Sequence, residues 1–389
     1  MDMPRRPVEW IPTRDFVPTH CPWKECSEHS PGPRSSRYRF HHHGYYERKC
    51  APHRIPRFRC CGCKRTYSRQ TFSTTYYAKL PKLLSLIAGL LQASACFRQI
   101  ARTLGCAHAT VGRAAARLGR HCMLLLARAL TEIGPVDEPL VIDHFEAFEL
   151  SQDLPFGIGT VVGHRSWFVY GLDPAIHGRG GRLTGGQRLR LAQRKVRERW
   201  GGYRGSFARL LDSLAGSAPE NGLTLVTDGH ASYAEALRDH PERRRFRHLA
   251  VPNPERGPKG SPRSEEAKFR DALMFPSDLL HALLRHSAKH HTRETIAFPR
   301  RLNAALERGF LYAAWRNFVK GRSERKPDRR TPAMLLGLTD VPWSWPRVLG
   351  RRLFFSHLTL PASWARLYRR DWTTPELGRN TRHTLIHAF

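Results

Sequence analysis

The spacing of apolar residues changes several times along the 389-residue chain and divides it into segments of different character. Residues 1–76 have little periodic apolar pattern and are rich in Cys, His, Pro and Arg, which predicts a small domain without a large core. From residue 78 to 130, Leu and Ala recur at helical spacing, so we expect three or four helices. Pro135 and Pro139 end that pattern and place a helical domain at residues 77–135.

From residue 139 onward, short apolar runs alternate with helical stretches, which indicates an α/β fold class. We expect helices over residues 231–238 and from 265 to about 320, the latter interrupted at Pro276 and Pro299. The Gly- and Arg-rich segment at about 178–205 predicts a basic insertion. The α/β domain, with this insertion, would span residues 136–330, and residues 331–389 would form a basic, Trp-rich tail. The expected strands are 140–142, 157–162, 167–172, 223–227 and 248–251.

The charge balance favours a polyanion as partner. The chain has 65 Lys+Arg against 33 Asp+Glu, a formal net charge of +32 that is spread over its whole length. No stretch approaches the ~18 apolar residues of a membrane span, and residues 1–12 lack the apolar core of a signal peptide. We therefore expect a cytoplasmic protein that binds no membrane, with its nine cysteines reduced.

Four cysteines near the N-terminus have the spacing of a zinc site. Cys21 and Cys26 form a C-x4-C pair, and Cys60 and Cys63 form a C-x2-C pair. Two such pairs separated by a loop match the tetrahedral thiolate site of a zinc ribbon that holds Zn²⁺. The choice of ligands stays open, because other residues could replace a member of either pair. These residues are Cys61 in place of Cys60, and Cys50 or His20 in the first pair.

Residues 96–118 predict a helix-turn-helix. Gly105 would end a first helix with one apolar face, and a second helix would begin at His108 or Ala109. The outward face of the second helix would lie near a major groove of DNA and would carry Thr110, Arg113 and Arg117. The alternative is an ordinary helical hairpin with a solvated, Arg-bearing face.

Two aspartates, Asp143 and Asp228, each follow a short apolar strand. Functional groups of an α/β sheet gather where strands end, and two carboxylates on neighbouring strands can share hard divalent cations such as Mg²⁺. Two such ions would serve phosphoryl transfer. The alternative for each Asp is a cap or a turn, since Asp228 and Gly229 form a good turn pair.

A metal site of this kind usually needs a third acid. Asp278 lies just after Pro276, at the expected start of a helix that could pack beside the strands. The other downstream acids stay open as candidates: Glu265, Glu266, Asp271, Glu294 and Glu307.

Taken in order, these motifs resemble the bacterial insertion-sequence transposases of the DDE class, in the branch with an N-terminal zinc ribbon and a helix-turn-helix. The resemblance covers roughly residues 20–340 and includes Phe-Arg-Cys-Cys-Gly-Cys-Lys-Arg-Thr-Tyr-Ser, Arg-Gln-Ile-Ala-Arg-Thr-Leu-Gly-Cys, Val-Ile-Asp-His-Phe-Glu, Val-Thr-Asp-Gly-His-Ala-Ser-Tyr and Arg-Glu-Thr-Ile-Ala-Phe-Pro-Arg-Arg. It implies an RNase-H-like catalytic domain behind the two DNA-binding modules. It also implies a bacterial protein that associates with the nucleoid when it is bound to DNA.

The resemblance implies which acids carry the chemistry. In that branch a third acid, usually Glu, precedes the Arg-Glu-Thr-Ile-type segment by about four helical turns. Asp278 stands there, 17 residues before Thr295, so the chain has Asp where the family has Glu. Asp143, Asp228 and Asp278 would then hold Mg²⁺ or Mn²⁺, with Glu294 as the alternative third acid.

The implied activity is metal-dependent DNA cleavage and strand transfer. Water would attack a phosphate at the end of the element, and the released 3′-hydroxyl would attack target DNA. The partners would be double-stranded DNA, both terminal repeats and target, and a second copy of the chain on paired ends. Two alternatives stay open: a non-catalytic DNA-binding regulator derived from a transposase, and an RNase-H-like nuclease that cuts without joining.

Overall fold

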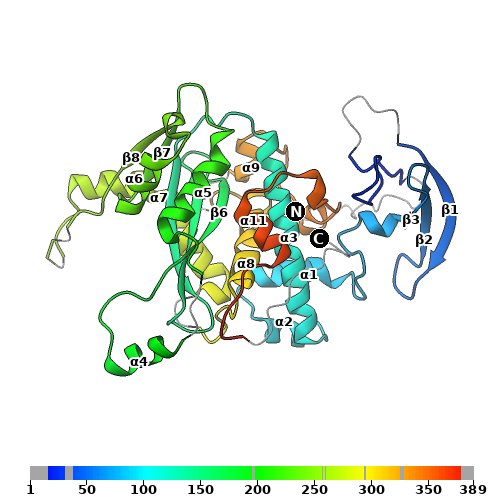
Figure 1. The fold of residues 1–389 in the computed structure, drawn as a ribbon, viewed down its shortest axis with the longest axis horizontal. Helices are drawn as coiled ribbons and strands as arrows, with labels where there is room; N and C mark the ends of the chain where they lie inside the picture. The colour runs from blue at the N-terminus through cyan, green and yellow to red at the C-terminus, as the bar shows by residue number, and fades with distance from the viewer. Residues whose placement is uncertain are drawn as a thin grey trace, which may run out of the picture.

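The computed structural model shows a mixed α/β protein with two separate sheets joined by helices (Figure 1). It describes residues 16–30, 38–194, 198–255, 257–258, 260–292, 295–324 and 328–377. The smaller sheet lies at the right of Figure 1, the larger sheet lies at the left, and α1, α3, α8 and α11 stand between them. Among the described residues, none of the helices combines the length and the apolar character that crossing a bilayer requires.

The smaller sheet is N-terminal and antiparallel. Its strands β1 (Phe40–Glu47), β2 (Arg54–Cys60) and β3 (Thr66–Ser68) pair in the order β1-β2-β3, and the 3₁₀ turn η1 (Arg69–Phe72) follows. A small core of its own, built from aromatic rings and cysteines around the fully buried Phe58, holds it together. One ring of this core, Phe354, comes from far along the chain.

Three helices follow: α1 (Leu83–Gln92), α2 (Phe97–Thr103) and α3 (His108–Glu132). Gly105, with φ +61°, takes the left-handed conformation that ends α2. The 25-residue α3 runs into the main core and crosses α8 (Leu302–Ala314). A Cβ at Gly119 would lie 2.2 Å from the carbonyl oxygen of Glu307, so only glycine allows this contact. The helices predicted at 77–135 therefore share one core with the α/β region.

The larger sheet has five strands in the order β6-β5-β4-β7-β8. Strands β4, β5 and β6 pair antiparallel to one another. Strand β7 pairs parallel to β4, and β8 pairs parallel to β7. All five expected strands are present, and most are longer than their apolar runs, because residues beyond those runs still pair with a neighbouring strand. Their bounds are β4 (Leu140–Phe148), β5 (Pro155–Gly163), β6 (Val169–Ile176), β7 (Leu223–Thr227) and β8 (Phe246–Ala250).

Helices cover both faces of this sheet. On one face, α5 (Gly202–Ala215) and α6 (Ala231–Asp239) contact the imidazole of His144 in β4. On the other face, α7 (Glu265–Ser287) contacts Asp143, the residue before His144, because successive side chains of a strand point to opposite faces of the sheet. The π-helical η4 (Trp315–Val319) continues α8, and short 3₁₀ turns lie at η2 (Arg243–Arg245) and η3 (Lys289–His291).

Pro276 does not interrupt the helix that contains it, contrary to the prediction. It lies inside α7, which continues from Glu265 to Ser287. Its side chain is buried, and the missing N–H removes one helical hydrogen bond. Packing of α7 against the sheet outweighs this loss, so Asp278 lies in the middle of a helix rather than at its start.

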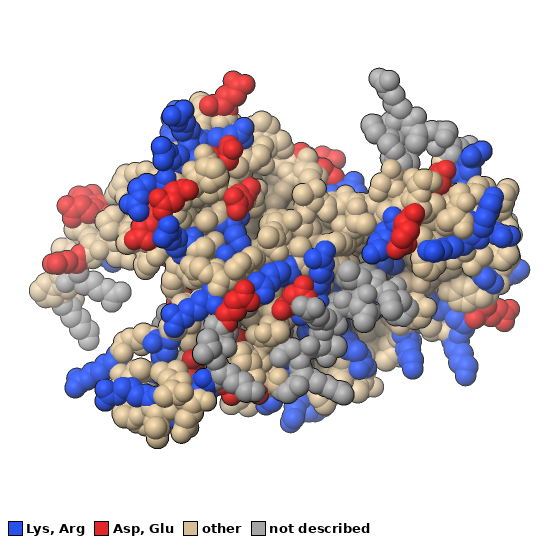
Figure 2. Space-filling view, viewed as in Figure 1, with Lys and Arg blue, Asp and Glu red and all other residues tan. Residues whose placement is uncertain are grey.

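The basic insertion forms an arm around α4 (Gly185–Gln193), a helix with no buried residue. Its two ends are tied by Asp153, which pairs with Arg179 at 2.6 Å and with Arg194 at 3.3 Å. The next helix, α5, begins at Gly202, near the predicted end of the insertion at about residue 205. Figure 2 shows Lys and Arg spread from the N-terminal sheet to this arm, with acidic residues between them.

Residues 331–377 of the predicted basic tail are a packed part of the protein, and residues 378–389 lie outside the described residues. The two buried tryptophans Trp364 and Trp372 lie in the main core, where the indole N–H of Trp364 donates to the carbonyl of Leu172 at 2.8 Å. Arg352 donates to the carbonyls of Thr71 and Phe72 and so joins the segment to the N-terminal sheet. Its elements are α9 (Pro332–Leu335), α10 (Trp345–Val348), η5 (Phe355–His357) and α11 (Ala362–Arg369).

Candidate functional site

Four cysteines form a compact group at one end of the N-terminal sheet. The Sγ atoms of Cys21, Cys26, Cys60 and Cys63 all lie within 4.8 Å of one another. The Cys21–Cys63 and Cys26–Cys60 sulfurs are each 3.7 Å apart. Sulfurs placed about 2.3 Å from a tetrahedral zinc lie about 3.8 Å from each other. The four cysteines could therefore hold a zinc ion.

The local backbone explains why these four sulfurs converge. Cys60 ends β2, and Cys63 follows in the turn to β3. A Cβ at Gly62 would be in ordinary contact with the sulfurs of Cys26 and Cys60, at 3.5 Å and 3.6 Å, and only 3.1 Å from Cγ of Glu28, so this turn lies directly against the group. Burial alone would raise the pKa of the Cys60 thiol, but backbone N–H groups of the turn and the Tyr38 hydroxyl hold it at about 7.

The alternative ligands lie elsewhere. Cys61 is next to Cys60 but is not part of the group, since successive residues point in different directions. The Cys50 sulfur accepts hydrogen bonds from the guanidinium of Arg48. His20 packs against Phe72, Phe354 and His357 in the interface with the C-terminal segment.

The exposed side of α2 and α3 carries two of the three predicted DNA-binding residues. Arg113 is exposed, and its guanidinium lies 3.4 Å from the hydroxyl of Thr110 one turn earlier. Arg117 lies two turns beyond Thr110 along α3, at the junction with the N-terminal region, where its guanidinium donates to the Thr74 carbonyl at 3.5 Å. Burial lowers the pKa of Arg117 to about 10, and the positive charges of Arg120 and Arg352 add to that effect. Arg117 therefore does not share the exposed face.

The two strand aspartates meet through the register of the sheet. Val141 of β4 pairs with Val226 of β7, and the strands are parallel. Asp143 and Asp228 each lie two residues further on, so both point to the face that α7 covers. Asp228 directly follows β7, as predicted. Asp143 lies inside β4 rather than at its end, because β4 remains paired with β5 up to Phe148.

Asp278 is carried to the same face by α7. Met274 packs with Val141 and Val226 in one apolar cluster, and Asp278 lies one helical turn beyond Met274. Its carboxylate pairs with the guanidinium of Arg270 at 2.5 Å. Among the described residues only the cysteine group has three or more ligand atoms within 4.8 Å of one another, so the three aspartates do not form such a group.

The electrostatics of Asp143 show that the three acids interact. Burial raises the pKa of the Asp143 carboxyl to about 7, and the negative charges of Asp228 and Asp278 act in the same direction. The Asp143 side chain is 19% exposed, and one of its carboxylate oxygens lies 3.6 Å from Nδ1 of His281. Burial lowers the pKa of His281 to about 3, so its imidazole is neutral. A divalent cation bound between these carboxylates would reduce the repulsion among them.

Sequence patterns missed two residues beside these acids. His281 lies three residues after Asp278 and bonds Oγ1 of Thr160 with its other nitrogen, at 2.9 Å. Arg270 lies two turns before Asp278, and its positive charge lowers the pKa of Asp143 against the larger raising effects. The helical spacing 270, 274, 278 and 281 could have identified them, but only for a helix known to continue through Pro276.

The opposite face of β4 is held by His144. Its imidazole bonds the hydroxyls of Tyr233 at 2.8 Å and Ser206 at 3.1 Å. A Cβ at Gly159 would lie 2.9 Å from His144 Nε2, so glycine in β5 makes room for the ring. This buried arrangement fixes β4 behind Asp143.

The other candidate acids have structural partners or lie outside the described residues. Glu307 is buried and pairs with Arg120 at 3.1 Å, and Asp271 pairs with Arg263. Glu265 and Glu266 are exposed in the first turn of α7, where negative charge stabilises a helix. Glu294 lies outside the described residues.

Comparison with known proteins gives no relative from which to transfer a role. No protein-family model matches the chain, and a search of curated proteins found no significant similarity. The chemistry of the site therefore has to follow from its geometry.

Proposed function

We propose that this protein is a DNA transposase of the DDE class, with Asp143, Asp228 and Asp278 as its catalytic acids. The register of β4 against β7 is the observation that carries this proposal. It directs two carboxylates to one face of the sheet, and α7 adds the third from above. Metal-dependent phosphodiester chemistry needs such a set of oxygen ligands around a divalent cation.

The topology of the larger sheet supports the same proposal. Three antiparallel strands followed by two parallel ones, in the order β6-β5-β4-β7-β8, are what an RNase-H-like domain requires. The four-cysteine group suits a zinc ribbon, and α2 with α3 suits a helix-turn-helix. A formal net charge of +32 suits a chain that contacts DNA along much of its surface.

Different residues of the site would have different roles in the reaction. Asp143 and Asp228 would bind the cations, and their mutual repulsion in the free protein would be relieved by binding. His281, neutral and hydrogen-bonded to Thr160, would orient the Asp143 carboxylate. Arg270 would hold Asp278 in place. A bound Mg²⁺ would supply electrophilic stabilisation of the phosphate and a more acidic water.

The test is a cleavage and joining assay on DNA that contains the flanks of the gene, with Mg²⁺ and with the variant Asp228→Asn. We expect the wild type to cleave and join, and Asp228→Asn to do neither while it still binds the DNA. Asp239→Asn, at the exposed end of α6, is the matched control and should keep full activity.

The same assay separates the proposed activity from its rivals. Cleavage without joining would identify a nuclease, and DNA binding without either reaction would identify a regulator. Normal strand transfer by Asp228→Asn would remove this residue from the site and with it the proposed set of acids.

A further inference from the structure

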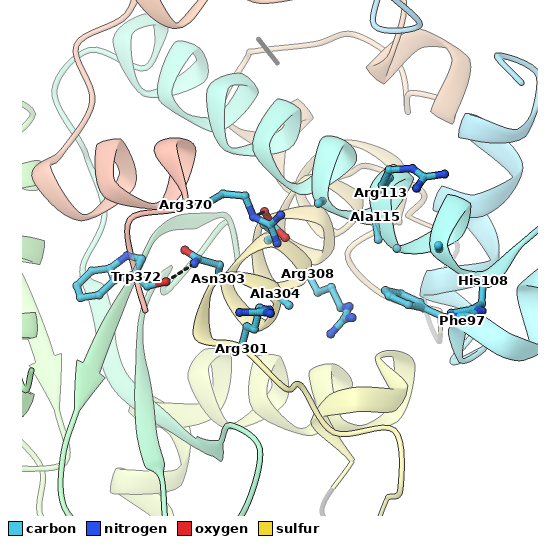
Figure 3. Close-up of a pocket in the computed structure, with 14 residues that line it drawn as sticks. Phe97, His108, Arg113, Ala115, Arg301, Asn303, Ala304, Arg308, Arg370 and Trp372 are labelled. Carbon is cyan, nitrogen blue, oxygen red and sulfur yellow. Dashed lines mark hydrogen bonds and ion pairs between the residues drawn. The ribbon is translucent and has the colours of Figure 1, made fainter. Parts of the chain in front are cut away.

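A cavity of about 660 Å³ lies between the first half of α3, α8 and the segment that follows α11 (Figure 3). Phe97 of α2 and His108 at the start of α3 form one side of it, and Ala304 of α8 and Trp372 lie on the other sides. The cavity is therefore bounded both by the predicted DNA-binding helices and by the α/β region.

The lining of this cavity is strongly cationic. Four of its side chains are arginines and one is a carboxylate, Glu307. That carboxylate is already shared by two guanidinium groups, since it lies 3.1 Å from Arg120 and 3.2 Å from Arg370. Glu307 therefore neutralises only part of the positive charge. The lining arginines are Arg113, Arg301, Arg308 and Arg370.

Arg308 is the lining arginine with two buried nitrogens that lack a hydrogen-bond partner among the described residues. Its guanidinium lies over the ring of Phe97, 4.5 Å from the centroid. Among the residues that the structure describes, neither its Nε nor its Nη1 has a hydrogen-bond partner, although both atoms are buried. Burial lowers the pKa of Arg308 to about 10, so the group is still charged at neutral pH. A buried charge with unsatisfied donors is destabilising unless a ligand satisfies it.

We propose that this cavity binds the phosphate groups of a DNA strand that lies along the start of α3, with Arg308 as the central ligand. Planar guanidinium groups match the oxygens of a phosphate. The cavity is far larger than one phosphate ion requires, and its volume suits a short stretch of backbone. Arg113 lies both on the exposed face of α3 and at the cavity, so one strand could contact both.

This site would connect DNA binding to the α/β region. The identification of its ligand as DNA rests on the proposed function. The cavity adds a DNA contact that the three acids do not supply. A strand held between α3 and α8 would bridge the helix-turn-helix and the helix that continues the catalytic domain. DNA binding would then stabilise the arrangement of the two regions.

The experiment measures binding of a labelled DNA duplex by the full-length chain over a range of salt concentrations, without divalent cation. Arg308→Met keeps an unbranched stem over Phe97 and removes the charge. We expect affinity to fall roughly tenfold at moderate salt. We also expect the slope of log K against log salt to decrease by about 0.9 for each lost phosphate contact. The free variant should melt at the same temperature as the wild type or higher, because removal of a buried charge with unsatisfied donors offsets the loss of the cation–π contact with Phe97.

Arg128→Met is the matched control. It removes the same charge from an exposed position near the other end of α3, where Arg128 pairs with Glu132. Its salt slope should stay at the wild-type value. An equal decrease in both variants would show a general charge effect and would overturn the site, as would an unchanged slope in Arg308→Met.

A second variant covers the case in which Arg308→Met does not fold. Ala304→Glu places a carboxylate one helical turn before Arg308, where an ion pair stabilises the helix. This variant should be more stable than the wild type and should bind DNA more weakly. Unchanged DNA binding by this variant would also contradict the proposal.

Inorganic phosphate at millimolar concentration distinguishes a free phosphate from DNA. If it raises the melting temperature of the wild type while Arg308→Met retains the full DNA salt slope, the cavity binds a small phosphate and the assignment to DNA is wrong. Because the assay contains no Mg²⁺ and scores no cleavage, its failure leaves the Asp228→Asn experiment untouched. Failure of the cleavage and joining assay would likewise leave the result of this binding assay valid.

Discussion

The carboxylate of Asp278 and the guanidinium of Arg270 lie 2.5 Å apart on the same helix, α7. Arg270 is 13% exposed and Asp278 is 45% exposed, so the pair joins a nearly buried cation to an accessible acid. Met274 lies halfway between them and packs against Val141 and Val226, the residues that precede the two strand aspartates. Arg270 therefore holds a third carboxylate at the edge of the site.

The identity of the third acid can be tested directly. Asp278→Asn should lower cleavage by roughly 100-fold or more, since even residues that only support metal ligands are worth about 10–100-fold. Arg270→Gln should have a smaller effect and should change the Mg²⁺ concentration needed for activity. Glu266→Gln, at an exposed position in the first turn of α7, is the control and should be neutral. Full activity of Asp278→Asn together with inactive Glu294→Gln would move the third acid to Glu294.

The raised pKa of Asp143 predicts a dependence of stability on pH. The pKa is 3.8 for an unperturbed Asp and about 7 in the folded protein, so the native state binds more protons than the unfolded state between these values. The Asp143 contribution to the free energy of unfolding therefore falls as pH rises through this window. Asp143→Asn should gain stability relative to the wild type from about pH 4 to about pH 7, and the difference should be constant above that.

Thermal unfolding without added divalent cation measures this difference, with the exposed Asp239→Asn as control. Added Mg²⁺ above pH 7 should stabilise the wild type and leave Asp143→Asn unchanged. A difference that does not vary with pH would show that Asp143 is not in the environment described.

The four-cysteine group predicts which cysteine substitution releases metal. Cys60→Ser should lower the zinc content of the purified chain from about one ion and should unfold the N-terminal sheet, because zinc binding and folding are coupled in such sites. Cys61→Ser changes the neighbouring residue outside the group and should keep the metal. Elemental analysis and limited proteolysis measure both properties, and loss of zinc in Cys61→Ser alone would reverse the ligand assignment.

The contact between α3 and α8 predicts a strong effect of one added methyl group. In Gly119→Ala the new carbon would meet the backbone of Glu307 at 2.2 Å, and a backbone cannot move aside without shifting a helix. We expect a loss of about 1–3 kcal/mol in the free energy of unfolding. Gly89→Ala in α1 is the control, because its nearest neighbour is 3.9 Å away and alanine favours a helix by up to about 1 kcal/mol. Equal stabilities of the two variants would contradict the packing.

The two arginines of α3 should respond differently to substitution. Arg113→Gln should weaken DNA binding and leave the melting temperature unchanged, because its side chain is exposed. Arg117→Gln should lower the melting temperature, because its guanidinium donates to the Thr74 carbonyl in the junction with the N-terminal domain. DNA-binding and melting curves of both variants test this assignment, and the opposite pattern would place Arg117 on the DNA.

Much of the local structure follows from the sequence. Apolar runs predicted the positions of β4 to β8, and Gly105 predicted the turn between α2 and α3. The spacing of Cys21, Cys26, Cys60 and Cys63 predicted their grouping, although it left other residues open as replacements, because short turns largely determine where the sulfurs point. Pro276 misled the prediction, since a local rule about proline does not include the packing that keeps α7 continuous.

The residues that meet across the chain were decided by the tertiary structure. Nothing near Arg117 in the sequence indicates Thr74, and nothing near Phe58 indicates Phe354. The Trp-rich composition of the C-terminal segment gave no sign that Trp364 lies in the core. Periodicity describes one element at a time, whereas such contacts depend on how several elements pack together. By itself, the sequence determined which chemical groups the protein has and the elements that carry them. Only the packing of α3, α7 and α8 on the strands decided which of those groups share a site.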